Sequence, residues 1–380
     1  MNNFTAFNPT RLIFGKGVIQ SMPLQLGKFG KKVLLVYGKG SIKKNSIYKE
    51  ITGILKEAGK TVIEFEGIKS NPLVNDVEKA IALGRKNKVD FVLAVGGGSV
   101  IDSAKIIALC IPGNFDPWKV MKYQEKATKA LPLVTVLTVA ATGTEMNQFA
   151  VLQNLKTEEK IGFGSPLIYP ALSYCDPSYT ISVSKQYTAY GIADIIAHSL
   201  EAYFGDGDAI LSDRFVAGII REMADAGTKL LKDLKNYNLR ARVMWASTCA
   251  LNGMTFHGRK SGDWGVHDLG HILSLLYDLP HGATLSIAYP AWMKYHSKTQ
   301  AERIQWLGKE VFGTKTVKQS IYAFENLFIK LHCPVRIQKV KVPVSKKKEI
   351  ISLMLQNKVS GMIVKLDAKA VKEMVELMFE

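Results

Sequence analysis

The first half of the chain alternates between two kinds of hydrophobic pattern. Short, mostly apolar runs of about strand length are separated by segments in which apolar residues recur every three to four positions. This alternation of strands and helices predicts a mainly parallel sheet with helices on both faces. The predicted strands are 31–37, 61–65, 90–95 and 131–139, the predicted helices are 46–58, 74–87 and 99–110, and an alternating segment at 149–163 predicts a hairpin.

From Ser184 onward the pattern changes to long helical periods. Neither an internal repeat nor a low-complexity linker separates the two halves. We therefore predict an α/β domain at 1–181 and an all-helical domain at 182–380. The helical periods cover 184–203, 208–234, 237–253 and 264–278, and they resume toward the C-terminus.

The composition is that of a globular protein with two domains. Hydrophobic residues make up 47% of the 380 residues, which is enough for two cores. No apolar run reaches the roughly 18 residues of a membrane helix, and residues 1–17 lack the pattern of a signal peptide. Cys110, Cys175, Cys249 and Cys333 are scattered, without a CxxC pair. These features predict a reduced, cytoplasmic protein without a membrane partner.

The formal net charge of +17 raises the alternative of a non-enzymatic, nucleic-acid-binding protein. The lysines are spread along the chain, however, and their only tight run is Lys346-Lys347-Lys348. The sequence also lacks the interleaved aromatic and basic residues of RNA-binding proteins. We therefore favour a solvated basic surface that helps to attract an anionic cofactor, with no specific nucleic-acid partner.

A run of three glycines, Gly96-Gly97-Gly98, stands between a predicted buried strand and a predicted helix. Glycines at such a junction let the backbone approach a pyrophosphate, whose charge is met by amides at the helix N-terminus. The alternative is a plain turn with a capping box between Ser99 and Asp102. Three consecutive glycines exceed what a cap needs, so the motif favours phosphate binding, although it is not the usual G-x-G-x-x-G.

The segment from Gly38 to Lys44 follows the first predicted strand of the sheet and contains no acid; the first acid downstream is Glu50. NAD-preferring enzymes usually place an acid near such a strand end, where it holds the ribose 2′-hydroxyl. The small and basic residues found here instead suit a 2′-phosphate. The alternative is a solvated loop with incidental lysines. We therefore predict a preference for NADP(H).

Hydroxyl groups and a glycine follow another predicted strand, from Thr138 to Glu145. Hydroxyls at the carboxyl end of a strand are placed to bond a ligand in the crevice there. The signal is weak by itself because threonine-rich turns are common.

Five residues form a candidate metal site. Asp194 and His198 are four apart in a predicted helix and project from one face. His267 and His271 also share a helix face, and His281 follows at an apparent break. A lone D-x-x-x-H would favour a structural role, but both sets together suit a divalent Fe, Zn, Mn, Co or Ni ion. The spacing leaves open which downstream histidine stays off the ion. We interpret the remaining histidines, His257, His296 and His332, as structural or surface residues.

Together these motifs resemble the iron-containing alcohol dehydrogenase family, and within it the NADPH-dependent butanol dehydrogenase or aldehyde reductase branch. The resemblance runs over essentially the whole chain. Each motif is moderately specific, and their combination is highly specific. The motifs are Phe14-Gly15-Lys16-Gly17, GGGSVID, ATGTE, GIADIIAHSLEAYF at 191–204, and the stretch from His267 to Gly282.

The resemblance implies an α/β N-terminal dinucleotide-binding domain and an all-α C-terminal domain, a fold shared with dehydroquinate synthase. It also implies one divalent metal, Fe²⁺ or Zn²⁺ with Mn, Co or Ni as alternatives. The implied ligands are Asp194, His198, His267 and His281, with His271 near the nicotinamide and off the metal. The implied NADP(H) contacts are Gly97, Gly98 and Ser99 at the pyrophosphate, Thr138 and Thr142 at the middle of the cofactor, Gly38, Gly40 and Ser41 at the ribose phosphate, and Asn71, Asp102, Asn147, Lys160 and Tyr179 elsewhere.

Two regions depart from the family pattern. The residues before His267, from Ser261 to Val266, vary locally, which leaves the substrate pocket undefined. Residues 339–360 match the family poorly, so their role stays open.

The implied activity is hydride transfer between NADP(H) and small primary alcohols or aldehydes, with the metal polarising the substrate oxygen. His271 is the candidate catalytic residue, as a proton relay. The alternative within the same fold is a lyase of dehydroquinate synthase type. Such an enzyme needs several basic groups around a polyhydroxy phosphate, whereas segment 191–204 offers mainly apolar side chains. We expect a homodimer.

Overall fold

A computed structural model describes all 380 residues, which form two compact units. Asn8–Val183 form the sheet unit, and Ser184–Glu380 together with Met1–Phe7 form the helical unit. The division after Val183 lies close to the predicted division after residue 181. Unlike in the prediction, the first seven residues pack with the helical unit, where the Asn2 amide donates to the Gly258 carbonyl (2.9 Å) and Phe4 stacks on His257.

The sheet unit is built on a six-stranded sheet in the order β1-β8-β5-β4-β2-β3. Every neighbouring pair is parallel, which confirms the predicted sheet. From β2 the chain adds β3 on one side, and it then returns to add β4 on the other. The strand order therefore reverses between β2 and β4, and doubly wound sheets bind ligands at the carboxyl ends of the strands at such a point. The strands are β1 (Arg11–Phe14), β2 (Lys32–Gly38), β3 (Thr61–Ile68), β4 (Phe91–Gly96), β5 (Leu133–Leu137) and β8 (Leu172–Cys175), with a separate antiparallel hairpin of β6 (Phe149–Asn154) and β7 (Glu159–Gly164).

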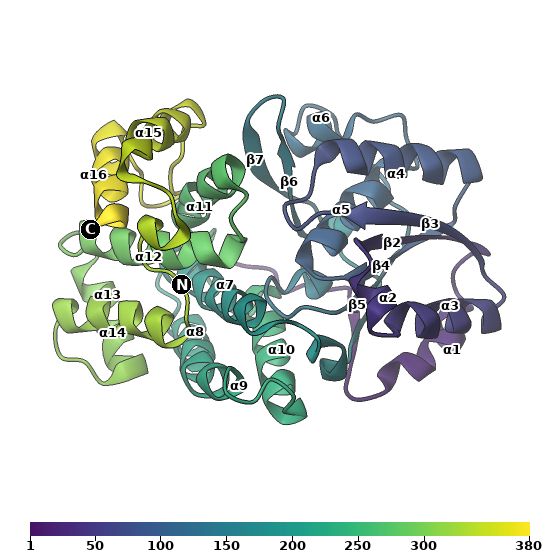
Figure 1. The fold of residues 1–380 in the computed structure, drawn as a ribbon, viewed down its shortest axis with the longest axis horizontal. Coiled ribbons are helices and arrows are strands. Elements are labelled where there is room, and N and C mark those ends of the chain that lie inside the picture. The colour runs from purple at the N-terminus through teal and green to yellow at the C-terminus, as the bar shows by residue number, and fades with distance from the viewer. The chain divides into compact units, whose positions relative to one another are not determined.

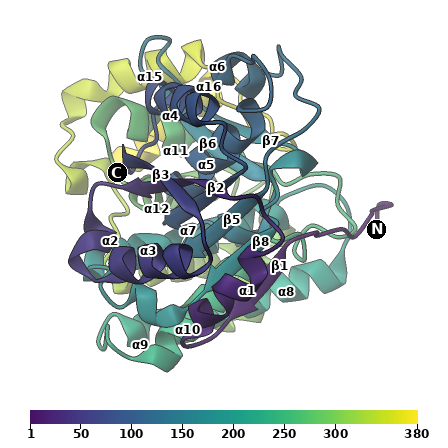
Figure 2. The same cartoon turned by 90° about the vertical axis from the view of Figure 1, so that its right-hand side faces the viewer.

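Helices cover both faces of this sheet, as Figures 1 and 2 show. Alternate residues of a strand point to opposite faces. Val33 and Leu35 therefore belong to the core formed with α1 and α3, whereas α5 packs on the opposite face. The strands are buried on both faces, which explains their nearly continuous apolar sequences. The helices are α1 (Met22–Leu26), α2 (Ser41–Lys44), α3 (Ile47–Glu57), α4 (Val74–Asn87), α5 (Gly98–Cys110) and α6 (Pro117–Met121), with short 3₁₀ turns at Val18–Ser21, Thr144–Met146, Pro166–Ile168 and Pro177–Thr180.

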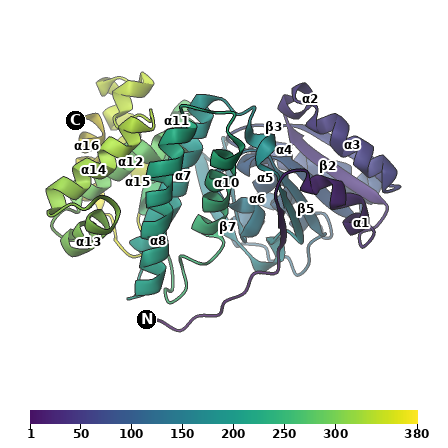
Figure 3. The same cartoon turned by 90° about the horizontal axis from the view of Figure 1, so that it is seen from below.

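The helical unit packs around a long central helix, α7 (Lys185–Tyr203). This helix contacts α8, α10 and α12, and Figure 3 shows it lying beside α8. No helix of the chain combines the length and the apolar character that crossing a membrane requires. The other helices are α8 (Ile210–Glu222), which continues through a π-helical turn at Met223–Gly227 into α9 (Thr228–Leu230), α10 (Tyr237–Leu251), α11 (Gly265–Tyr277), α12 (His281–Tyr295), α13 (Ala301–Phe312), α14 (Val317–Lys330), α15 (Lys347–Gln356) and α16 (Ala368–Phe379), with 3₁₀ turns at Ile337–Val340 and Val344–Lys346.

The C-terminal region supports the helices that carry the histidines. Helix α15 packs on α11, and α16 packs on α12. The Asp263 carboxylate accepts hydrogen bonds from the amides of Ile363 (3.1 Å) and Val364 (2.6 Å). The loop before α16 is thereby tied to the loop that leads into α11.

Candidate functional site

Helix α7 carries the first two candidate metal ligands. Asp194 and His198 project from the same face, one helical turn apart, and both are buried. The helix begins after Ser184, whose hydroxyl caps the Tyr187 amide. Its apolar residues are buried all around, so packing holds the two polar side chains in place.

Helices α11 and α12 bring three histidines to α7. His267 and His271 lie one turn apart on α11, which ends before Asp278 in the left-handed conformation (φ 49°). His281 then begins α12, with Pro280 at the N-cap position. A Cβ on Gly282 would lie 2.0 Å from the Tyr190 carbonyl oxygen. Only glycine therefore permits the contact that sets His281 against α7.

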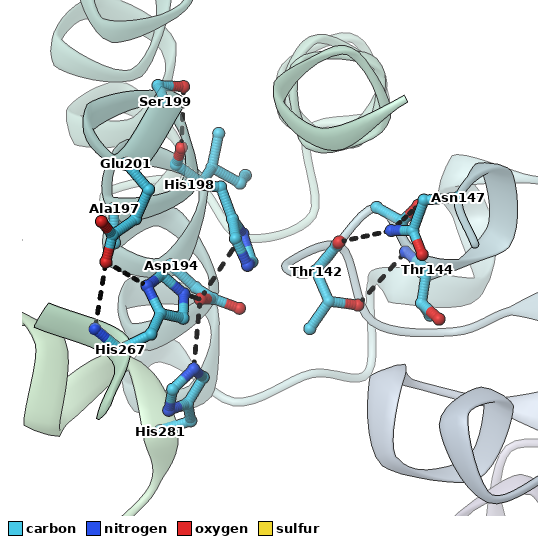
Figure 4. Close-up of polar contacts among 12 residues, drawn as sticks. Thr142, Thr144, Asn147, Asp194, Ala197, His198, Ser199, Glu201, His267 and His281 are labelled. Atoms are coloured by element: carbon cyan, nitrogen blue, oxygen red, sulfur yellow. Dashed lines mark hydrogen bonds and ion pairs between the residues drawn. The ribbon is translucent and has the colours of Figure 1, made fainter. Parts of the chain in front are cut away.

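The side chains converge on one carboxylate oxygen, Asp194 Oδ1 (Figure 4). His198 Nδ1 lies 3.6 Å from it, His281 Nε2 3.8 Å and His267 Nε2 3.9 Å. Donors of one tetrahedral ion lie about 3.4 Å apart, given metal–ligand distances of about 2.1 Å. Donor atoms of Asp194, His267 and His281 all lie within 4.8 Å of one another, which is close to that spacing, whereas His198 stands outside this group of three, although its Nδ1 approaches Asp194.

Glu201 orients His267 and is absent from the residues predicted above. Its Oε1 accepts hydrogen bonds from His267 Nδ1 (2.8 Å) and the His267 amide (3.0 Å), and its Oε2 accepts one from the Trp264 amide (2.6 Å). The other ring nitrogen of His267 is thereby turned toward Asp194. Carboxylate–histidine pairs of this kind fix the ring and its tautomer at metal sites. The sequence feature that could have identified Glu201 is its position three residues after His198, on the same helix face.

The other histidines lie outside this group. The His271 ring centre is 5.3 Å from that of His281 and 6.4 Å from that of His267, and His271 is not one of the three residues, Asp194, His267 and His281, whose donor atoms lie within 4.8 Å of one another. His257 stacks on Phe4, and His296 packs on Trp292. The His332 carbonyl accepts from Gln186.

In the sheet unit, the glycine run lies at the carboxyl end of β4, beside the chain reversal. Gly97 is the N-cap residue of α5, which begins at Gly98. The alternative capping box between Ser99 and Asp102 does not form. Ser99 lies inside the helix and its hydroxyl donates to the Ser70 carbonyl, while Asp102 accepts from Thr144 Oγ1 (2.6 Å). The junction therefore leaves amides at the helix N-terminus, as a phosphate site requires.

Comparison with known proteins assigns both units to one family. Residues 9–177 match the family described as iron-containing alcohol dehydrogenase, and residues 188–378 match its C-terminal domain. The chain belongs to the iron-containing alcohol dehydrogenase family.

Relatives in this family are similar along most of their length. The chain is 42% identical to a probable NADH-dependent butanol dehydrogenase of Bacillus subtilis over 83% of this chain and 81% of the relative. It is 38% identical to the NADPH-dependent aldehyde reductase YqhD of Escherichia coli over 89% of each. The crystal structure of NADH-dependent butanol dehydrogenase A from Thermotoga maritima superposes with a TM-score of 0.96 at 37% identity, covering 100% of this chain and 99% of that one.

Family membership makes the chain an oxidoreductase of alcohols or aldehydes, and it implies a divalent metal and a nicotinamide cofactor. The match covers both units, which favours the dehydrogenase over the lyase and over the nucleic-acid-binding protein considered above. The names of the relatives divide between NADH and NADPH.

In this dehydrogenase an acidic residue lies near the loop after β2, although the loop's own sequence contains none. Gly38 ends β2, Gly40 takes a positive φ of 80°, and Ser41 begins α2. Glu66, from the neighbouring strand β3, forms an ion pair with Lys43 at 2.6 Å. The pairing of β3 with β2 therefore places Glu66 beside this loop.

Two predicted cofactor residues belong to a buried polar network around Lys105. Its ammonium donates to Thr144 Oγ1 (2.8 Å), Asn147 Oδ1 (2.9 Å) and the Phe149 carbonyl (2.7 Å). Asp102 joins through Thr144. Burial lowers the pKa of the Lys105 ammonium to about 7, although the negative charge of Asp102 acts to raise it. The network fixes the turn after β5, which Figure 4 shows from Thr142 to Asn147.

The remaining predicted cofactor residues lie elsewhere in the sheet unit. Thr138 directly follows β5, and its amide donates to the Gly96 carbonyl (3.0 Å). The Lys160 ammonium donates to Asn71 Oδ1 (2.9 Å), and both residues are buried. The Tyr179 hydroxyl donates to Glu50 (2.6 Å). Glu50, the first acid downstream of the loop in sequence, is thus engaged near the start of α3.

Proposed function

We propose that this enzyme transfers a hydride between NADP(H) and small primary alcohols or aldehydes, acting mainly as an aldehyde reductase. In the proposal, Asp194, His198, His267 and His281 hold one divalent ion, Fe²⁺ or Zn²⁺ in the first instance. The observation that carries it is the convergence of three imidazole nitrogens on one buried carboxylate oxygen.

The residues fit such an ion. Buried polar atoms nearly always have a hydrogen-bond partner, yet His198 Nδ1 and His267 Nε2 are buried without one. Burial, and next the proximity of His267, lower the pKa of His198 well below its usual value. A neutral imidazole is the form that coordinates metal. When bound, the ion supplies a Lewis acid for the substrate oxygen.

The chain's own groups position the reactants. Glu201 holds the His267 ring in the orientation needed at the ion. His271, one turn along α11, is our candidate for passing a proton to the product oxygen. The backbone at Gly97, Gly98 and Ser99 would hold the pyrophosphate, because amides at a helix N-terminus bind anions.

Metal removal tests the proposal. Protein purified without air and then stripped with a chelator is expected to lose aldehyde reduction, and added Fe²⁺ or Zn²⁺ is expected to restore it. The metal content is measured beside turnover on a panel of short aldehydes. Full-rate reduction by protein shown to be metal-free would contradict the proposed role of the four ligands.

The cofactor preference is tested separately, by kcat/KM for NADPH and NADH with one aldehyde. We expect at least about a tenfold preference for NADPH, since a charge-assisted hydrogen bond to the 2′-phosphate contributes about 1.5–3 kcal/mol. Gly40→Asp should move the ratio toward NADH by repelling the phosphate. Gly40→Asn is the matched control, because it meets the same strain at a φ of 80° without the charge. An equal or better rate with NADH in the wild type refutes the preference.

A further inference from the structure

A carboxylate from the neighbouring strand faces the loop assigned to the adenosine ribose. Glu66 lies near the end of β3, in register with Tyr37, the penultimate residue of β2. Its Oε2 accepts a hydrogen bond from Lys43 Nζ at 2.6 Å. Its Oε1 lies 3.7 Å from the position of a Cβ built on Gly40. A negative charge therefore lies beside the loop, although the loop's own sequence contains no acid.

Aromatic rings hold the Lys43 ammonium in place. The nitrogen lies 5.3 Å from the ring centres of both Tyr37 and Tyr48. The hydroxyls of these tyrosines donate to Glu64 at 2.7 and 2.8 Å, so the rings are anchored as well. The side chains of Lys43 and Glu66 are 41% and 44% exposed to solvent, respectively. The ion pair is thus ordered and still accessible to a ligand.

We propose that Glu66 is a specificity-determining residue that limits the preference for NADP(H). It engages the ammonium of Lys43 and adds negative charge where a 2′-phosphate would bind, so the phosphate must compete with it. A ribose 2′-hydroxyl carries no charge and can donate to a carboxylate, so NAD(H) binding is not penalised. The inference rests on the proposed placement of the ribose at Gly38, Gly40 and Ser41.

The test uses nucleotides that report only on the adenosine end of the cofactor. Adenosine 2′,5′-bisphosphate and 5′-AMP are titrated by calorimetry into the wild type and into Glu66→Gln, without nicotinamide or turnover. We expect Glu66→Gln to lower the Kd of the bisphosphate about fivefold, the size of an exposed charge interaction. The Kd of AMP should change less than twofold. The NADPH-to-NADH ratio of kcat/KM should rise in the same proportion.

Two further variants test whether the effect arises from the contact between Glu66 and Lys43 or from a general loss of negative charge. Glu57→Gln removes an exposed acid of α3 away from the loop and should change neither Kd. In a Lys43→Met background, Glu66→Gln should give a smaller gain, because the contested ammonium is gone. An unchanged or raised bisphosphate Kd in Glu66→Gln overturns the inference, as does a full fivefold gain without Lys43.

Failure of the inference can be told apart from failure of the proposed ribose placement. If Gly40→Asp weakens the bisphosphate relative to AMP while Glu66→Gln has no effect, only the role of Glu66 is refuted. If neither substitution changes the discrimination between the two nucleotides, the loop does not contact the 2′ position, and the placement itself is refuted.

Discussion

Alanine at His267 is expected to abolish the proposed metal binding and to lower aldehyde turnover about a thousandfold, since Lewis-acid stabilisation contributes several kcal/mol. His267 Nε2 is one of the nitrogens that face Asp194 Oδ1, and Glu201 fixes its ring. Removing it leaves an incomplete set of donors. Metal stoichiometry of anaerobically purified protein is measured beside turnover.

Three further variants show whether the loss of metal is specific to the proposed ligands. His271→Ala should keep a full equivalent of metal and lose only rate, because His271 is not among the proposed ligands or in the group of close donor atoms formed by Asp194, His267 and His281. His296→Ala removes another buried histidine of the same unit and should leave metal content unchanged. Glu201→Gln should fall between, with metal affinity about 10- to 100-fold lower. A metal-free His271 variant beside a fully loaded His267 variant would refute the ligand set.

Valine at Gly98 is expected to weaken binding of NADPH beyond detection, with circular dichroism and metal content near wild type. A Cβ at this position would lie 2.8 Å from Thr142 Oγ1 and Cγ2. In the proposed function, a larger side chain here would also keep a pyrophosphate away from the amides at the start of α5. The proposed metal ligands are all in the helical unit, so their site should be unaffected. Binding is measured by the fluorescence of NADPH.

The structure also offers controls for this substitution. Gly53, in α3 of the same unit, has no neighbour within 4 Å of a built Cβ, so Gly53→Val should bind NADPH normally. Gly98→Ala combined with Thr142→Ala relieves most of the internal clash. If that double variant recovers tight binding, the clash with Thr142 caused the defect. Tight binding by Gly98→Val itself would refute the pyrophosphate assignment.

The sequence predicted the central parts of the sheet unit well, because each strand there is buried on both faces and stands out as a short apolar run. It did not predict β1 and β8, whose four residues each are too few for a periodic signal. It predicted one helix over 208–234, where the chain forms α8, a π-helical turn and α9. A π-turn changes the hydrogen-bond partners without interrupting the apolar pattern.

Local spacing accounts for the helix-borne pairs of the candidate metal site. Asp194 with His198, and His267 with His271, share a face because four residues make about one helical turn. Spacing left open which downstream histidine stays off the ion. The packing of Gly282 against Tyr190 sets His281 beside α7, and that contact joins positions distant in sequence.

What the sequence by itself determined is therefore the central strands and the long helices, their order, and the residue types at each strand end and helix face. These depend on periodicity and on neighbours within a few residues. The tertiary structure alone decided that Glu201 orients His267 and that Glu66 faces the loop after β2. Both carboxylates act across long sequence separations, through the approach of α11 to α7 and the pairing of β3 with β2. Such proximity is fixed by packing and strand register, which no local pattern of side chains encodes.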